Sequence, residues 1–300
     1  MPMAAPPLLP HGADTRLRIS ANNWTTPVPA APGDALSCGS GDQAPVHFIH
    51  VPKTAGATME HYLPWQVTRH IGGPSAADTA CSRMARSRCV WWHTPPRDWG
   101  SWPWGNQTKT ATFCVVRHPL DRLLSEYKMT EAHKPSINNA AALNKWILQA
   151  VATASRREYW LNNCHFLPQV EFVWDGSGQR TCQHTLCYEH LATDYDLLMR
   201  QLLGPYKTNG HDRLTWVPLD ATRPVTHHGA TNLTIADIGA DAKHSVEKLY
   251  LKDMCFFGYA PADDIRCAPL IRQELGQPPR LSGLRARCSA PREAVHAPLD

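Results

Sequence analysis

An apolar run that ends in a small, hydroxyl-bearing turn with one lysine constrains this chain more than any other stretch. The run, residues 46–51, is partly β-branched and aromatic and stops at Pro52, which favours a buried strand over a helix. A helix is expected to begin near Gly56. Where a strand passes into a helix through small residues, backbone N–H groups and the positive helix end point toward one place. The turn is therefore predicted to bind phosphate or sulfate.

A second strand-to-helix turn follows further along the chain. Residues 111–116 form an apolar run that ends in Arg117, and apolar side chains recur at helical spacing after Pro119, a residue suited to a first helical turn. Arg117 offers a forked donor for a phosphate group. Ser125 is expected on the helix face opposite the leucine stripe, where it is free to meet the same ligand.

The remaining sequence alternates between helical and strand patterns. Helices are predicted near 140–153, 155–162, 191–203 and 242–250, and short strands at 184–188 and 214–217. Alternation of this kind is typical of a parallel sheet. We expect a P-loop-like α/β fold: a single domain with a central parallel β-sheet flanked by helices.

The termini differ in composition from the middle of the chain. Residues 1–45 are rich in Pro and Ala and are predicted to form a disordered tail or stalk, with the domain at 46–262 and a poorly ordered tail at 263–300. The net charge of +4 includes no dense basic run, so a nucleic-acid partner is not indicated. No window is apolar enough to cross a bilayer, so no membrane anchor is evident and the chain is expected to be soluble.

The chain contains ten cysteines, an even number that is high for a cytosolic enzyme. Disulfides are predicted, because no CxxC pair with a second half-site indicates a metal centre. Sequence proximity makes three pairs candidates for closing loops: Cys81 with Cys89, Cys182 with Cys187, and Cys255 with Cys267. Glycosylation sequons at Asn23, Asn106 and Asn232 also fit a secretory compartment.

Together, residues 50–58 (HVPKTAGAT) and 113–127 (FCVVRHPLDRLLSEY) resemble the two signature segments of PAPS-dependent sulfotransferases, where PAPS is 3′-phosphoadenosine 5′-phosphosulfate. The nearest resemblance is to the Golgi carbohydrate group of heparan and chondroitin type. In that family the segments are the 5′-phosphosulfate loop, H-x-P-K-T-G-G-T-T, and the 3′-phosphate segment, R-x-P-x-x-R-x-x-S-x-Y. Weaker resemblance extends over most of residues 46–260.

The chain departs from the family pattern in both segments. Ala55 stands where the family usually has Gly, and its methyl group confines the backbone to negative φ unless strain is accepted. Ala57 stands where Thr is common, so one hydroxyl is missing. His118 stands where Asp or Asn is frequent and where a side-chain cap for the next helix is expected.

The resemblance implies transfer of a sulfuryl group from PAPS to a carbohydrate hydroxyl, without a metal, in the Golgi lumen or the secretory pathway. It implies these cofactor-binding residues: Lys53, Thr54, Ala55, Gly56, Ala57, Thr58, Arg117 and Ser125. Lys53 also has a catalytic role in this scheme, since it can neutralise the bridging oxygen as the bond to sulfur breaks. A P-loop kinase is disfavoured, because no GxxxxGK[ST] motif is present.

Sulfuryl transfer also needs a general base near Lys53. His93, between the two segments, is the first candidate by resemblance, and Glu60 and His61, on the helix after the loop, are the next. The tryptophans around His93 either stack on sugar rings or pack a loop without regular structure. Two alternatives remain open: a non-catalytic PAP- or glycan-binding protein of the same fold, and a sulfotransferase that acts on a small metabolite or protein tyrosine.

Overall fold

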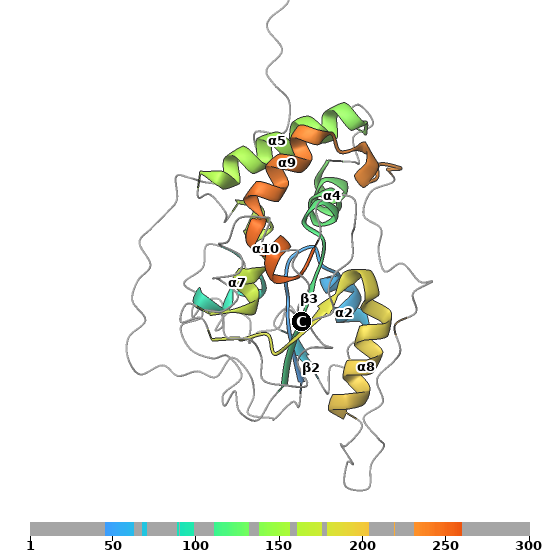
Figure 1. Ribbon diagram of the computed structural model, residues 1–300. Helices are drawn as coiled ribbons and strands as arrows, with labels where there is room; N and C mark the ends of the chain where they lie inside the picture. The colour runs from blue at the N-terminus through green and yellow to red at the C-terminus, as the bar shows by residue number, and fades with distance from the viewer. Residues whose placement is uncertain are drawn as a thin grey trace, which may run out of the picture.

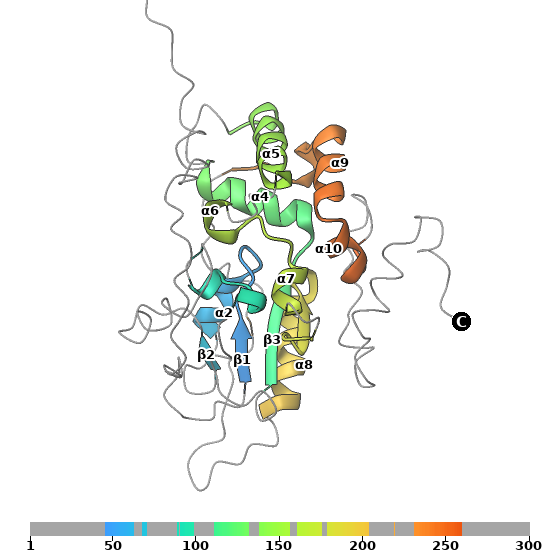
Figure 2. The same ribbon diagram turned by 90° about the vertical axis from the view of Figure 1, so that its left-hand side faces the viewer.

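The computed structural model describes residues 46–62, 68–70, 89, 91–98, 111–131, 138–156, 161–175, 179–203, 219 and 231–259. Within them lies a four-stranded, all-parallel sheet in the order β2-β1-β3-β4 (Figures 1 and 2). The strands are β1 (Val46–Ile49), β2 (Thr68–His70), β3 (Ala111–Val116) and β4 (His184–Cys187). The predicted single α/β domain with a parallel sheet flanked by helices is confirmed.

Helices surround this sheet. The α-helices are α2 (Gly56–Tyr62), α4 (Pro119–Thr130), α5 (Ala140–Ser155), α6 (Leu161–Cys164), α7 (Val170–Val173), α8 (Leu191–Leu203), α9 (Ala240–Leu249) and α10 (Leu251–Phe256). Short 3-10 helices are η1 (Trp91–His93), η2 (Pro96–Asp98), η5 (Tyr188–His190) and η6 (Ile235–Asp237).

Both faces of β1 and β3 are buried, which explains why these strands are largely apolar runs rather than alternating ones. On β3, Phe113 and Val115 face the helices α2 and α8, whereas Cys114 and Val116 face the side covered by α7 and α10. A third apolar cluster joins α4, α5 and α9 beyond the carboxyl ends of the strands (Figure 1). The predicted leucine stripe of α4 is confirmed as part of this cluster.

Most predicted elements within the described residues agree with the structure. The helix predicted over 155–162 is contradicted at both ends, because α5 ends at Ser155 and the chain at Asn162 and Asn163 has left-handed φ values of 47° and 62°. Residues 157–160 lie outside the described residues. Asn tolerates this conformation better than most residues. Strand β2 was not predicted, since its three residues, Thr-Arg-His, carry no apolar pattern. The predicted strand at 214–217 and both predicted tails lie outside the described residues.

Two disulfides between described residues join segments that are distant in sequence, Cys89 with Cys164 and Cys114 with Cys182. The predicted pairs of Cys81 with Cys89 and of Cys182 with Cys187 are therefore wrong. Sequence proximity misled here because pairing follows neighbourhood in the fold: Cys114 lies on β3 and Cys182 just before the adjacent strand β4. Cys267 lies outside the described residues. Disulfides are typical of secreted or lumenal proteins.

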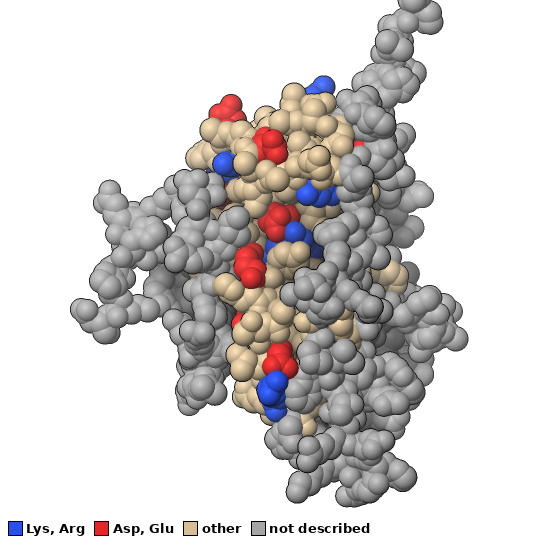
Figure 3. All heavy atoms as spheres, turned by 90° about the vertical axis from the view of Figure 1, so that its right-hand side faces the viewer, with Lys and Arg blue, Asp and Glu red and all other residues tan. Residues whose placement is uncertain are grey.

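In the part of the chain that the structure describes, no helix combines the length and the apolar character that a membrane span requires. On the face shown in Figure 3, acidic and basic side chains of the described residues are interspersed, with no broad patch of one sign.

Candidate active site

The two predicted anion-binding turns lie side by side at the carboxyl ends of the two central strands, β1 and β3. Strands β1 and β3 are hydrogen-bonded neighbours with Phe48 opposite Phe113, and a turn follows the carboxyl end of each. After β1 the chain continues to β2 on one side, whereas after β3 it continues to β4 on the other. In open parallel sheets, ligands bind at such a switch in strand order.

The first turn has an unusual backbone. Lys53 and Ala55 have positive φ values of 67° and 85°, in the left-handed region that residues with a Cβ rarely occupy. The backbone at Ala55 therefore adopts the strained conformation that its methyl group disfavours. The hydroxyl of Thr54 donates to the carbonyl of Val51 at 2.8 Å and is buried, so it closes the turn.

The left-handed backbone predicts that Ala55→Gly will raise the free energy of unfolding by about 1 kcal/mol, because glycine adopts positive φ without a steric cost. Urea denaturation measures this change. Ala57→Gly is the matched control: Ala57 is exposed in the first turn of α2, and its replacement should lower stability by about 0.5 to 1 kcal/mol. Equal losses for the two variants would contradict the left-handed conformation at Ala55.

Gly56 is required by a close approach rather than by its φ angle. A methyl group built on Gly56 would overlap the imidazole ring of His50, so any larger residue there would require that ring to move. Ala57 is exposed and Thr58 half-buried. Among the described residues, the backbone N–H groups of 54–58 donate no hydrogen bond outside the helix, as expected at a helix start. These donors are available to an anion.

The second turn presents Arg117 beside the first. Arg117 Nε donates to Asp121 Oδ2 at 2.6 Å, one Nη approaches the carbonyl of Lys53 at 3.4 Å, and the guanidinium lies over the ring of Tyr188. His118 Nδ1 accepts from the backbone N–H of Leu120 at 3.3 Å, which confirms the expected side-chain cap of α4.

Ser125 is half-buried on the same helix. It lies one turn beyond Asp121, the partner of Arg117, and therefore shares that helix face. This arrangement agrees with the expected position of Ser125 away from the leucine stripe.

A buried network of hydrogen bonds fixes the second turn. The side chain of Gln169 exchanges two hydrogen bonds with the main chain of Arg117, at 2.9 and 2.8 Å. Asp253, from α10, accepts from the backbone N–H groups of Gln169 and Val170 at 2.8 and 3.0 Å. Burial raises the pKa of Asp253 to about 6. The position of Arg117 thus depends on residues far along the chain, which sequence reasoning did not identify.

Arg122 joins the two turns from inside the protein. It is fully buried, and it donates from Nε to the carbonyl of Pro52 at 2.9 Å and from Nη1 to the carbonyl of Leu167 at 2.7 Å. Its Nη2 is buried without a hydrogen-bond partner among the described residues. Arg122 is the second arginine of the R-x-P-x-x-R pattern, so the sequence did carry a signal for it.

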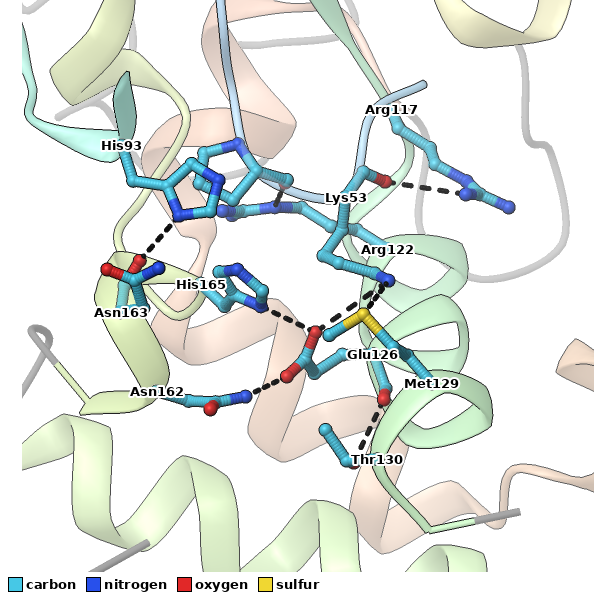
Figure 4. A network of polar contacts seen from close by, with 11 residues as sticks. Lys53, His93, Arg117, Arg122, Glu126, Met129, Thr130, Asn162, Asn163 and His165 are labelled. Atoms are coloured by element: carbon cyan, nitrogen blue, oxygen red, sulfur yellow. Dashed lines mark hydrogen bonds and ion pairs between the residues drawn. The ribbon is translucent and has the colours of Figure 1, made fainter. Parts of the chain in front are cut away.

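Lys53 reaches a buried acidic group on α4 (Figure 4). Its Nζ lies 3.1 Å from Met129 Sδ and 4.0 Å from Glu126 Oε2. Burial is the main cause that lowers the Lys53 pKa; Arg117 and Arg122 lower it further, and Glu126 opposes them. Three cationic groups therefore meet where β1 and β3 end.

Glu126 also holds a histidine that the sequence did not single out. Glu126 Oε2 lies 2.7 Å from His165 Nδ1, and Oε1 accepts from the side-chain amide of Asn162. Glu126, Asn162 and His165 follow no motif that marks them as a unit, although His165 falls in the stretch 163–169 of weaker family resemblance.

His93 lies in the same cluster, at the end of η1. Its Nδ1 is 3.0 Å from the carbonyl oxygen of Asn163, and its ring packs edge-on against those of His50 and His165 at 4.9 and 4.8 Å between centroids. Burial, followed by the two neighbouring imidazoles, lowers the pKa of His93 far below its usual range.

The other predicted site residues are placed only in part. Glu60 and His61 belong to α2, but their side chains lie outside the described residues, as do Trp99, Trp102 and Trp104. The described residues contain no group of three or more His, Cys, Asp or Glu side chains arranged to hold a metal ion.

A parallel α/β sheet with two adjacent cationic turns at its switch point defines a class of protein that binds phosphate or sulfate groups there. The model described as "Sulfotransferase family" matches residues 41–260, and the chain belongs to this family. No curated protein and no solved structure matches the chain. Family membership establishes sulfuryl transfer as the general activity and implies PAPS as the donor.

Proposed function

We propose that this protein transfers the sulfuryl group of PAPS to a hydroxyl group of a carbohydrate in the Golgi lumen. The observation that carries the proposal is the convergence of Lys53, Arg117 and Arg122 at the ends of β1 and β3. Asp121 and Glu126 offset part of this positive charge, and a bound anion offsets more of it. A donor with separate phosphosulfate and phosphate groups supplies that charge in two places.

The residues present fit such a donor. The backbone N–H groups of 54–58 and Lys53 suit the 5′-phosphosulfate, and Gly56 leaves no side chain in the way. Arg117 and Ser125 suit the 3′-phosphate, since both lie on the α4 side of the second turn. When bound, PAPS supplies an activated sulfuryl group. Lys53 then stabilises negative charge on the departing phosphate oxygen.

A carbohydrate acceptor is favoured by the resemblance to the heparan and chondroitin group and by Trp92. Trp92 is half-buried in η1, with its ring 6.0 Å from that of His93 between centroids. An aromatic ring at this place offers an apolar surface for the C–H face of a sugar. The two disulfides fit an oxidising compartment of the secretory pathway.

Incubation of the protein with ³⁵S-labelled PAPS and a panel of acceptors tests this proposal. The panel contains desulfated heparan and chondroitin chains, a tyrosine peptide and a small phenol, with Lys53→Ala as the inactive control. We expect label on a glycan. Label on the peptide or phenol alone would refute the carbohydrate acceptor, and PAP binding without any transfer would favour a non-catalytic protein.

A further inference from the structure

We infer that His165, oriented by Glu126, accepts the proton of the acceptor hydroxyl, in the role that the sequence predicted for His93. This inference rests on the proposed function, because it assigns a residue of the same site. It stands on the cluster formed by Lys53, Glu126 and His165 (Figure 4).

The contacts of Glu126 define the tautomer of His165. The carboxylate accepts at one oxygen from Asn162 and at the other from His165 Nδ1, at 2.7 Å. An ionised carboxylate only accepts, so Nδ1 carries a proton and Nε2 carries the lone pair. The negative charge also stabilises the imidazolium that forms when Nε2 takes a proton, as a carboxylate does in hydrolase triads.

The position of His165 suits an in-line transfer. The entering and leaving oxygens lie on opposite sides of the sulfur, so the base and the cation must adjoin that sulfur from two directions. Glu126 Oε2 contacts both groups, His165 Nδ1 at 2.7 Å and Lys53 Nζ at 4.0 Å. One buried carboxylate therefore fixes the base relative to the lysine.

The step balances without a further reactant. The acceptor oxygen forms the new O–S bond, and its proton passes to His165 Nε2. The bond between sulfur and the bridging oxygen breaks, and its electron pair stays on the phosphate beside Lys53. Solvent then removes the proton from His165.

His93 is less suited to hold a proton. Its Nδ1 faces the neutral carbonyl of Asn163, at 3.0 Å, rather than a carboxylate. Burial and the adjacent imidazoles of His50 and His165 disfavour its charged form. His93 packs edge-on against His165 and therefore lines the site instead.

The backbone before His165 is strained in a way that serves this arrangement. Asn162, Asn163 and Cys164 have consecutive positive φ values of 47°, 62° and 66°. This conformation directs the Asn162 amide to Glu126 and the Asn163 carbonyl to His93, and the disulfide from Cys164 to Cys89 ties it to the segment before η1. Strain of this kind persists where the surroundings enforce it, often at functional sites.

Kinetics of three variants test the inference: His165→Asn, Glu126→Gln and His93→Asn, with His244→Asn on the exposed face of α9 as the control. We expect His165→Asn to lower kcat at least about 100-fold, the range for a lost general base, with PAP affinity unchanged by calorimetry. The loss for His93→Asn should be smaller. Imidazole added to a His165→Gly variant should restore part of the activity.

A comparison of Glu126→Gln with Glu126→Ala tests the positioning of His165. The amide oxygen of Gln can still accept a hydrogen bond from His165 Nδ1, whereas Ala removes the acceptor. Glu126→Gln should therefore keep a larger share of kcat than Glu126→Ala.

A His165→Asn variant that keeps kcat within about threefold of the wild type, or loses less than His93→Asn, would overturn the inference. If His165→Asn loses its melting transition, equal kcat values for folded Glu126→Gln and Glu126→Ala would overturn it instead. Wild-type protein that binds no PAP would refute the proposed function itself, which is a distinct result.

Discussion

Replacing Lys53 with Ala should lower kcat for sulfuryl transfer by about 100- to 1,000-fold, the usual effect of removing one group that stabilises developing charge. The side chain of Lys53 is 12% exposed, and in this partly desolvated place its charge interacts more strongly than in water. Transfer from ³⁵S-labelled PAPS under saturating donor measures kcat directly.

The matched control for this variant is Lys128→Ala, a half-buried lysine in the last turn of α4, which should leave kcat unchanged. Because burial lowers the pKa of Lys53, the alkaline limb of the wild-type profile should lie below that of an ordinary lysine. A Lys53→Ala enzyme with wild-type kcat would remove Lys53 from the chemical step.

Replacing Arg117 with Ala should weaken PAP binding by about 10- to 100-fold, the value of charge-assisted hydrogen bonds to a phosphate. The guanidinium is 13% exposed on its side chain and is held by Asp121 and by the ring of Tyr188. It is therefore oriented before any ligand binds, so the loss should be seen in affinity.

Comparing PAP with adenosine 5′-phosphate, which lacks the 3′-phosphate, makes this prediction specific. The wild type should prefer PAP, whereas Arg117→Ala should bind the two nucleotides within about threefold of each other. Arg200→Ala is the control, since Arg200 pairs with Asp196 on the exposed side of α8. An unchanged preference for PAP in Arg117→Ala would place the 3′-phosphate elsewhere.

The fold was largely predictable because its signals are local. Strands β1 and β3 are largely apolar runs that end before a proline, and α4 begins at a proline after a capping residue, so neighbouring residues determine each of these elements. Strand β2 lacks such a pattern, and the Cys114–Cys182 disulfide joins positions 68 residues apart. These features depend on packing that no short window of sequence contains.

The candidate site was likewise predictable only in part. Lys53, Gly56 and Arg117 stand at strand-to-helix turns, where motif spacing identifies them, and Arg117 contacts the carbonyl of Lys53 in the structure. Glu126 and His165 were missed, because their contact spans 39 residues and arises from the left-handed backbone at 162–164. A sequence pattern cannot show that one oxygen of Glu126 contacts both His165 and Lys53.

Calorimetric titration of the wild-type protein with PAP tests the proposed site most directly. PAP should bind in a one-to-one complex, tighter than adenosine 5′-phosphate, and the heat should fall sharply for both Lys53→Ala and Arg117→Ala. Absence of PAP binding by a folded wild-type protein, or binding that neither substitution weakens, would contradict the assignment of the two turns to the sulfuryl donor.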